Sequence, residues 1–148
     1  MLTFRVRESL DVYAPRQAVG ALARQLGFAS SECAELSIVV SELASNIVKY
    51  GVRGSIELTP LDDPPNGTGL SIVAHDVGPP FRDWNMALRD GCDDRGPIGP
   101  AELLRREGLG IGLGAVVRLS HGLELETGAD GKRIRVVRYV TPVRIDRL

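Results

Sequence analysis

Apolar and polar residues alternate along five short stretches of the chain, with the period of two that is typical of half-buried β-strands. These stretches are residues 2–6, 55–59, 69–76, 123–127 and 133–140. Turn-forming residues at 62–67 and 128–131 separate neighbouring stretches. The pattern therefore predicts two antiparallel hairpins, the first with a long loop, and a further short strand is expected around residues 11–13.

Between the predicted strands at residues 2–6 and 55–59, apolar residues recur at the three- and four-residue spacing of amphipathic helices. The first predicted helix covers residues 15–26 and ends before Gly27, a residue suited to a left-handed helix end. The second begins near Ser30 and ends before Gly51. Its apolar stripe comprises Leu36, Val39, Val40, Leu43 and Ile47. This stripe predicts the longest helix of the chain, with one face in the core.

Glycine and proline are concentrated between residues 78 and 114. Short helices are expected over residues 84–89 and 101–106, and a further helix over residues 114–119. Long segments of this kind inside a compact domain usually serve as functional loops. Residues 78–114 are therefore the part of the chain in which we expect a lid.

The order of the predicted elements indicates an α+β fold. It is a two-layer α/β sandwich with a mostly antiparallel sheet that helices cover on one face. Strand–helix alternation of the doubly wound kind is absent, and no P-loop motif occurs. A length of 148 residues fits one domain, so residues 1–148 are predicted to form a single unit.

Composition narrows the range of functions. The chain is 43% hydrophobic and 25% charged, and 18 basic against 19 acidic residues leave a net charge of -1, which favours neither nucleic acid nor an anionic membrane as a partner. No apolar run approaches the roughly 20 residues of a membrane helix. Two cysteines without metal-ligand spacing fit reduced thiols. We therefore expect a cytoplasmic protein that binds neither nucleic acid nor membrane.

Candidate chemistry begins on the second predicted helix. Glu42 and Asn46 are four residues apart, so they project from one helix face at about 40° from each other, at the rim of the apolar stripe. Lys49 lies on the other flank of Glu42. A carboxylate, an amide and an ammonium group in this arrangement could hold a metal-bound phosphate and activate a nucleophile. The alternative is a solvated polar pair on a helix surface.

Two further features lie in the second half of the chain. Asp76 ends the apolar face of its strand, where a carboxylate needs a donor, such as an adenine amino group or the backbone of an Asx turn. Gly78 follows in a tight turn. His75 points to the opposite face of the sheet. The glycine-rich run 108–114 precedes an apolar helix and could cradle a phosphate or act as a hinge.

Taken in order, three motifs resemble the nucleotide-binding motifs of the GHKL ATPase superfamily. They are Glu42-x-x-x-Asn46, Asp76-Val-Gly78-Pro-Pro-Phe and Gly108-x-Gly110-x-Gly112. Residues 23–28 (ARQLGF) and 41–51 (SELASNIVKYG) are most similar to the anti-sigma-factor serine kinases, in particular the RsbT-type switch kinases. The resemblance covers about residues 10–140.

This resemblance implies the Bergerat ATP-binding fold, with ATP and Mg²⁺ as ligands and residues 78–114 as the ATP lid. Glu42 would be the general base, Asn46 the Mg²⁺ ligand, and Asp76 the acceptor for the adenine amine, with Gly78 packed against the base. Contacts to the phosphates are implied for Lys49 and for the lid residues Gly108, Leu109, Gly110, Ile111 and Gly112.

The implied function is that of an ATP-dependent protein serine/threonine kinase that acts as a regulatory switch of the anti-sigma type. It would phosphorylate a STAS-domain anti-anti-sigma protein, with a PP2C-type phosphatase or a sigma factor as further partners, and a homodimer is compatible with the resemblance. Members commonly carry Gly-Thr-Thr where this chain has Gly131-Lys132-Arg133. This departure keeps open a non-catalytic nucleotide-binding module that regulates a phosphatase, sigma factor or receptor by binding.

Overall fold

The computed structural model describes residues 1–89, 92–93, 96–97 and 112–141. Its main element is a five-stranded antiparallel sheet with the strand order β1-β2-β3-β7-β6. These strands are β1 (Leu2–Val6), β2 (Gly54–Asp63), β3 (Gly67–Asp76), β6 (Gly122–Gly128) and β7 (Gly131–Tyr139). The helices are η1 (Ser9–Val12, a 3-10 helix), α1 (Tyr13–Leu26), α2 (Ser30–Tyr50), α3 (Trp84–Ala87) and α5 (Leu113–Arg118). A separate ribbon pairs β4 (Cys92–Asp93) with β5 (Gly96–Pro97).

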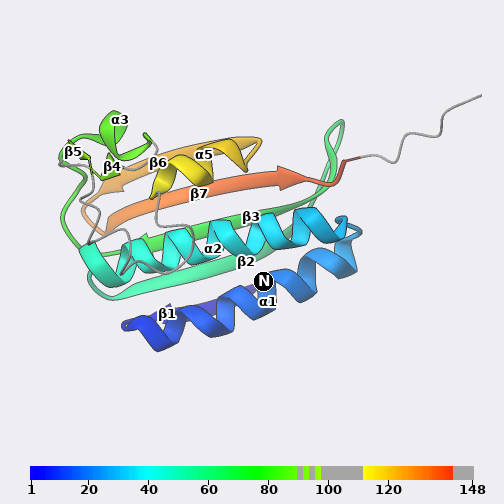
Figure 1. Cartoon of the computed structure of the whole chain (residues 1–148), viewed down its shortest axis with the longest axis horizontal. Helices are drawn as coiled ribbons and strands as arrows, with labels where there is room; N and C mark the ends of the chain where they lie inside the picture. The colour runs from blue at the N-terminus through cyan, green and yellow to red at the C-terminus, as the bar shows by residue number, and fades with distance from the viewer. Residues whose placement is uncertain (90–91, 94–95, 98–111, 142–148) are drawn as a thin grey trace, which may run out of the picture.

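The helices α1, α2 and α5 lie on the same side of the large sheet (Figure 1). The long helix α2 runs along β2 and β3, with α1 on one flank and α5 on the other. The opposite face of the sheet carries no helix in the part of the chain that the structure describes. This arrangement confirms the predicted α+β class, a two-layer sandwich with an antiparallel sheet covered on one face.

The core forms between α2 and the covered face of the sheet. Alternate strand residues are buried, including Ile56, Leu58, Leu70 and Ile72, and they pack in the same cluster as the apolar stripe of α2, namely Leu36, Val39, Val40 and Leu43. Each of these side chains is at most 1% exposed, and burial of one such side chain contributes about 1.5–3 kcal/mol. The predicted stripe of α2 is confirmed, and its packing fixes the helix against the strands.

One predicted element is wrong. The short strand expected around residues 11–13 is the 3-10 helix η1 followed by the start of α1. The Asp11 carboxylate accepts hydrogen bonds from the backbone N–H groups of Arg7 and Glu8, at 2.8 and 3.1 Å. These bonds close a tight turn after β1, so the chain cannot remain extended there.

The first hairpin is tighter than predicted. β2 continues to Asp63 and β3 starts at Gly67, so the turn is short where a long loop was expected. Leu61 pairs with Gly69 and Asp62 with Thr68 in this extension. The turn itself comprises residues 64–66, in the middle of the predicted turn at 62–67, and cross-strand pairing takes up the remaining residues.

A salt-bridge cluster joins the end of β7 to the start of α2. Alternation along β7 places Arg138 on the helix side of the sheet, where it forms salt bridges with Glu32 and Glu35. Its side chain is 13% exposed. Arg133 and Arg135, on the open face, are exposed as a strand surface predicts. Alternation along β7 therefore separates two exposed arginines from Arg138, which forms salt bridges on the covered face.

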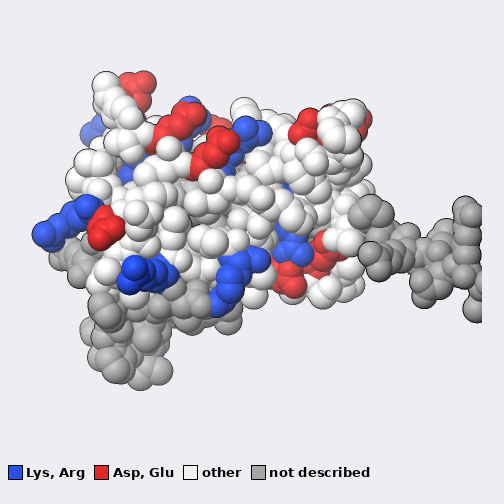
Figure 2. Space-filling view, turned by 90° about the horizontal axis from the view of Figure 1, so that it is seen from above, with Lys and Arg blue, Asp and Glu red and all other residues white. Residues whose placement is uncertain are grey.

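Acidic and basic side chains are interspersed on the face of the molecule seen in Figure 2. This distribution agrees with the near-balanced charge of the chain, because no patch of one sign dominates that face. Among the helices that the structure describes, none has both the length and the apolar character required to cross a bilayer.

Candidate nucleotide-binding site

The polar residues of α2 lie in its second half. Glu42 is only 3% exposed, whereas Asn46, one turn later, is partly exposed and Lys49 is exposed. Glu42 is thus more deeply buried than its predicted position at the rim of the apolar stripe. The three side chains follow one helix face from the buried interior towards solvent.

Asp76, the last residue of β3, is 5% exposed and lies on the helix side of the sheet. Its Oδ1 accepts a hydrogen bond from the backbone N–H of Gly78 at 2.8 Å, which closes the Asx turn that the sequence allowed. The same oxygen is 2.8 Å from Nζ of Lys132. His75 points to the opposite face, where its Nε2 lies 3.0 Å from the carbonyl oxygen of Asp130.

Two glycines bring the end of α2 against Asp76. A Cβ atom on Gly51, the residue after α2, would lie 2.8 Å from Cγ of Asp76. A Cβ atom on Gly78 would lie 2.8 Å from Oδ1 of Asp76 and 3.2 Å from Cα of Gly51. The backbone N–H of Val77 also donates to the carbonyl of Val52 at 2.8 Å. The predicted site residues of α2 and β3 therefore lie at the same end of the molecule.

Of the five lid residues predicted to contact the phosphates, the structure describes only Gly112. Gly112 has a φ of 72° and immediately precedes α5, which packs against α2. Gly108, Leu109, Gly110 and Ile111 lie outside the described residues, as does the helix predicted over residues 101–106. Earlier in the predicted lid, Phe81 and Trp84 pack together with ring centroids 4.9 Å apart.

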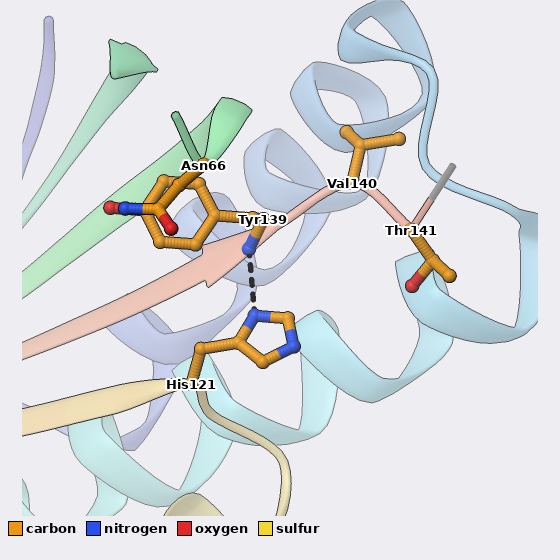
Figure 3. Close-up of a pocket in the computed structure, with 5 residues that line it drawn as sticks. All are labelled: Asn66, His121, Tyr139, Val140 and Thr141. Carbon is orange, nitrogen blue, oxygen red and sulfur yellow. Dashed lines mark hydrogen bonds between the residues drawn. The ribbon is translucent and has the colours of Figure 1, made fainter. Parts of the chain in front are cut away.

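A pocket at the other end of β7 is separate from these residues. It is lined by Asn66, His121, Tyr139, Val140 and Thr141 (Figure 3). The Nδ1 atom of His121 accepts a hydrogen bond from the backbone N–H of Tyr139 at 2.9 Å. Lys132 is near the start of β7 and Tyr139 is its last residue, so this pocket lies far along the strand from Asp76.

The sequence did not predict the contact between Lys132 and Asp76. The Lys132 side chain is 6% exposed, and its Nζ donates to Oδ1 of Asp76 and to the carbonyl oxygen of Pro79, each at 2.8 Å. A signal was present, because alternation along β7 places Lys132 on the same face as the apolar residues Ile134 and Val136. A lysine on a buried face needs a partner of opposite charge.

Residues 7–138 match the model of a histidine kinase-like ATPase domain. The chain belongs to this family. It is also 31% identical, over 137 residues, to the serine/threonine-protein kinase RsbT of Bacillus subtilis (strain 168), an alignment that covers 92% of this chain and 94% of that protein. The chain is therefore a GHKL-type ATPase domain of the RsbT type, and the resemblance seen in its motifs is confirmed.

Family membership implies a site for ATP, and the residues around Asp76 fit one. Oδ2 of Asp76 has no hydrogen-bond partner among the described residues, and 7% of the side chain remains exposed to a ligand. Gly51 and Gly78 leave no side chain over this carboxylate, so a flat base could approach it. The floor of the site thus offers an acceptor in a closely packed, glycine-walled position.

The donor set also fits Mg²⁺ held jointly by protein and phosphate. Asn46 supplies a carboxamide oxygen, a ligand type that hard divalent cations accept. Within the described ranges, no cluster of three or more His, Cys, Asp or Glu side chains could hold an ion alone. Mg²⁺ commonly takes one or two protein ligands and completes its shell with phosphate oxygens and water. A single carboxamide ligand from Asn46 is compatible with such a shell.

Proposed function

We propose that this protein is an ATP-dependent serine/threonine kinase that transfers a phosphoryl group to a protein partner. The observation that carries the proposal is the position of Glu42, a carboxylate 3% exposed on the same face of α2 as Asn46. The helix ends at Tyr50, and the next residue, Gly51, packs on Asp76. Glu42 as the general base, Asn46 as the metal ligand and Asp76 as the acceptor for adenine are the groups that phosphoryl transfer from ATP requires.

In the proposed reaction the serine hydroxyl oxygen of the partner forms a bond to the γ-phosphorus of ATP. The bond between that phosphorus and the bridging oxygen breaks, and ADP leaves with the electron pair. Glu42 accepts the hydroxyl proton, so the nucleophile gains charge as the new bond forms. Asp76 orients the nucleotide by accepting from the adenine amine, and Gly78 allows the base to pack against the backbone.

Asn46 would hold Mg²⁺, which supplies positive charge against the phosphate oxygens. Lys49 is exposed three residues further along α2, where its flexible ammonium group can reach phosphate. Gly108, Leu109, Gly110, Ile111 and Gly112 are proposed as the part of the lid that contacts the phosphates.

The proposed substrate is the serine of a small STAS-domain anti-anti-sigma protein, with a PP2C-type phosphatase or a sigma factor as further partners in a regulatory switch. The similarity to RsbT along 92% of the chain supports a role of this class. We place the protein in the cytoplasm, where ATP and such partners occur together.

The test combines nucleotide binding with phosphotransfer. Glu42→Gln keeps the size of the side chain and removes the base, so ATP affinity should remain within a few-fold while transfer to a serine-bearing STAS protein falls by about 10²- to 10⁴-fold. Glu124→Gln, on the exposed open face of the sheet, is the matched control and should transfer at the wild-type rate. Unchanged transfer by Glu42→Gln would rule out the base assignment.

The same measurements separate the kinase from a non-catalytic nucleotide-binding module. Calorimetry with and without Mg²⁺ should show metal-dependent ATP binding in the wild type, which Asn46→Ala loses. The observation that favours the module is Lys132, whose Nζ bonds Oδ1 of Asp76 and which stands where members of the family commonly carry threonine. ATP binding without phosphoserine on any STAS partner would favour the module.

A further inference from the structure

Lys132 places a buried positive charge at the floor of the proposed nucleotide site. In the β3–β7 pairing it lies directly opposite Asp76. Its ammonium group is 5.5 Å from the centre of the Phe81 ring, so it is covered on the side of the turn that follows β3. A lysine in this environment requires full hydrogen bonding, because an unpaired buried charge is strongly destabilising.

The hydrogen bonds that the described residues supply to Lys132 and Asp76 leave this pair incompletely bonded. An ammonium group has three donors, and Nζ uses two of them, on Asp76 and on the carbonyl of Pro79. The Asp76 carboxylate uses Oδ1 for both of its bonds and leaves Oδ2 without a partner among the described residues. Within the part of the chain that the structure describes, one N–H donor of Lys132 and one carboxylate oxygen of Asp76 therefore remain without a partner, on two groups that are bonded to each other.

This donor–acceptor pair matches one edge of adenine. The 6-amino group of adenine donates and the adjacent N1 accepts, so the edge presents a donor next to an acceptor. We propose that Lys132 is a specificity-determining residue that donates directly to N1 of the adenine ring while Asp76 accepts from the 6-amino group. This inference rests on the proposed function, because it concerns the base of the same nucleotide.

The pair also predicts which bases are rejected. In a 6-oxopurine such as hypoxanthine, the exocyclic oxygen would face the Asp76 carboxylate and the N1–H would face the Lys132 ammonium group. One contact then brings two acceptors together and the other brings two donors together, so these buried polar groups cannot form hydrogen bonds with each other. Inosine triphosphate should bind about 100-fold more weakly than ATP, or worse.

A purely structural role for Lys132 makes a different prediction. If its only task were to neutralise Asp76 and hold the turn at Pro79, its removal would weaken all nucleotides alike. A direct bond to N1 instead couples the identity of residue 132 to one atom of the ligand. The discriminating measurement is therefore the loss of binding affinity when N1 is removed from the ligand, compared between the protein with Lys132 and the variant without it.

The experiment is calorimetric binding of the magnesium complexes of ATP and 1-deaza-ATP to the full chain and to Lys132→Met. Methionine keeps an unbranched stem but has no N–H group. The wild type should bind ATP about 10- to 100-fold more tightly than 1-deaza-ATP, as expected for a hydrogen bond to a charged donor. Lys132→Met should bind the two ligands equally, and Lys132→Thr is the second variant if methionine impairs folding.

Purine riboside triphosphate, which lacks the 6-amino group, is the control ligand because it tests Asp76 and should lose affinity in both proteins. Equal binding of ATP and 1-deaza-ATP by the wild type would overturn the role of Lys132 while leaving the ATP site intact. The same ratio in wild type and Lys132→Met, or inosine triphosphate binding as tightly as ATP, would also overturn it. Absence of binding for every adenine nucleotide would instead refute the proposed function and this inference together.

Discussion

Gly131 is the position at which the site depends most directly on the absence of a side chain. It begins β7 with a φ of 104° and directly precedes Lys132. A Cβ atom there would fall on the carbonyl oxygen of Asp76 and lie 2.7 Å from Cα of Val77. These are backbone atoms of the neighbouring segment, so they cannot move aside as a flexible side chain would. Gly131→Ala should therefore destabilise the fold by two separate effects.

The first effect is backbone strain, and Gly27 measures it alone. Gly27 follows α1 with a φ of 97°, and a Cβ atom there would meet nothing within 4 Å. Alanine at such a φ costs about 1–2 kcal/mol, which is the loss expected for Gly27→Ala. Forcing an extra carbon into a filled space costs a further 1–3 kcal/mol or so. Gly131→Ala should thus lose roughly 2–5 kcal/mol of unfolding free energy.

The assay is urea unfolding of wild type, Gly27→Ala and Gly131→Ala, followed by far-ultraviolet circular dichroism. Gly67→Ala is a second strain control, because Gly67 has a φ of 85° and open space around it. Gly131→Ala should also weaken ATP binding, since the clash pushes on Asp76, whereas Gly27→Ala should not. Equal destabilisation by all three substitutions would refute the packing argument, and unchanged ATP affinity in Gly131→Ala would refute its link to the site.

Two predictions concern the far end of β7. Arg138→Met should lower the unfolding free energy by about 1–3 kcal/mol, because it leaves Glu32 and Glu35 without their shared cation. Urea denaturation of the variant and the wild type tests this, and equal stability of the two proteins would contradict it. The pKa of Tyr139 is raised above its usual 10.0 by the hydrogen bond from its hydroxyl to Asp63, by burial and by the Asp63 charge. This bond therefore stabilises the fold below pH 10 and is lost as pH rises through the raised pKa. Ultraviolet titration should show an ionisation above pH 10 that Tyr139→Phe removes, and an identical titration of both proteins would contradict the assignment.

Local pattern predicted most of the framework because each signal lies within one segment. The three- and four-residue spacing of Leu36, Val39 and Leu43 needs only the helix itself, and α2 follows it from Ser30 to Tyr50. The short segment after β1 was mistaken for a strand because a side-chain contact decided its shape. The Asp11 carboxylate accepts hydrogen bonds from the backbone N–H groups of two preceding residues. These bonds favour a turn, and they outweigh the preference for an extended strand that the alternating pattern indicates.

The ribbon of β4 and β5 was also missed. Each strand contains two residues, which is too short for any alternation to be recognised. Its position in a glycine- and proline-rich segment pointed to a loop, and pairing between Cys92 and Pro97 depends on how that segment returns on itself. Such pairing belongs to the tertiary structure and leaves no periodic trace in the sequence.

The floor of the site illustrates why its chemistry could be predicted only in part. Asp76 was identified from its place at the end of an apolar strand face, but its partner Lys132 is 56 residues away in the chain. The partner depends on the β3–β7 register, in which Asp76 faces Lys132 and His75 faces Arg133. A slip of one residue would turn Lys132 to the open face and bring Arg133 to the covered one. Gly131 permits the close approach of the two strands at this point, so the register, rather than either charged residue alone, determines what a bound base would meet.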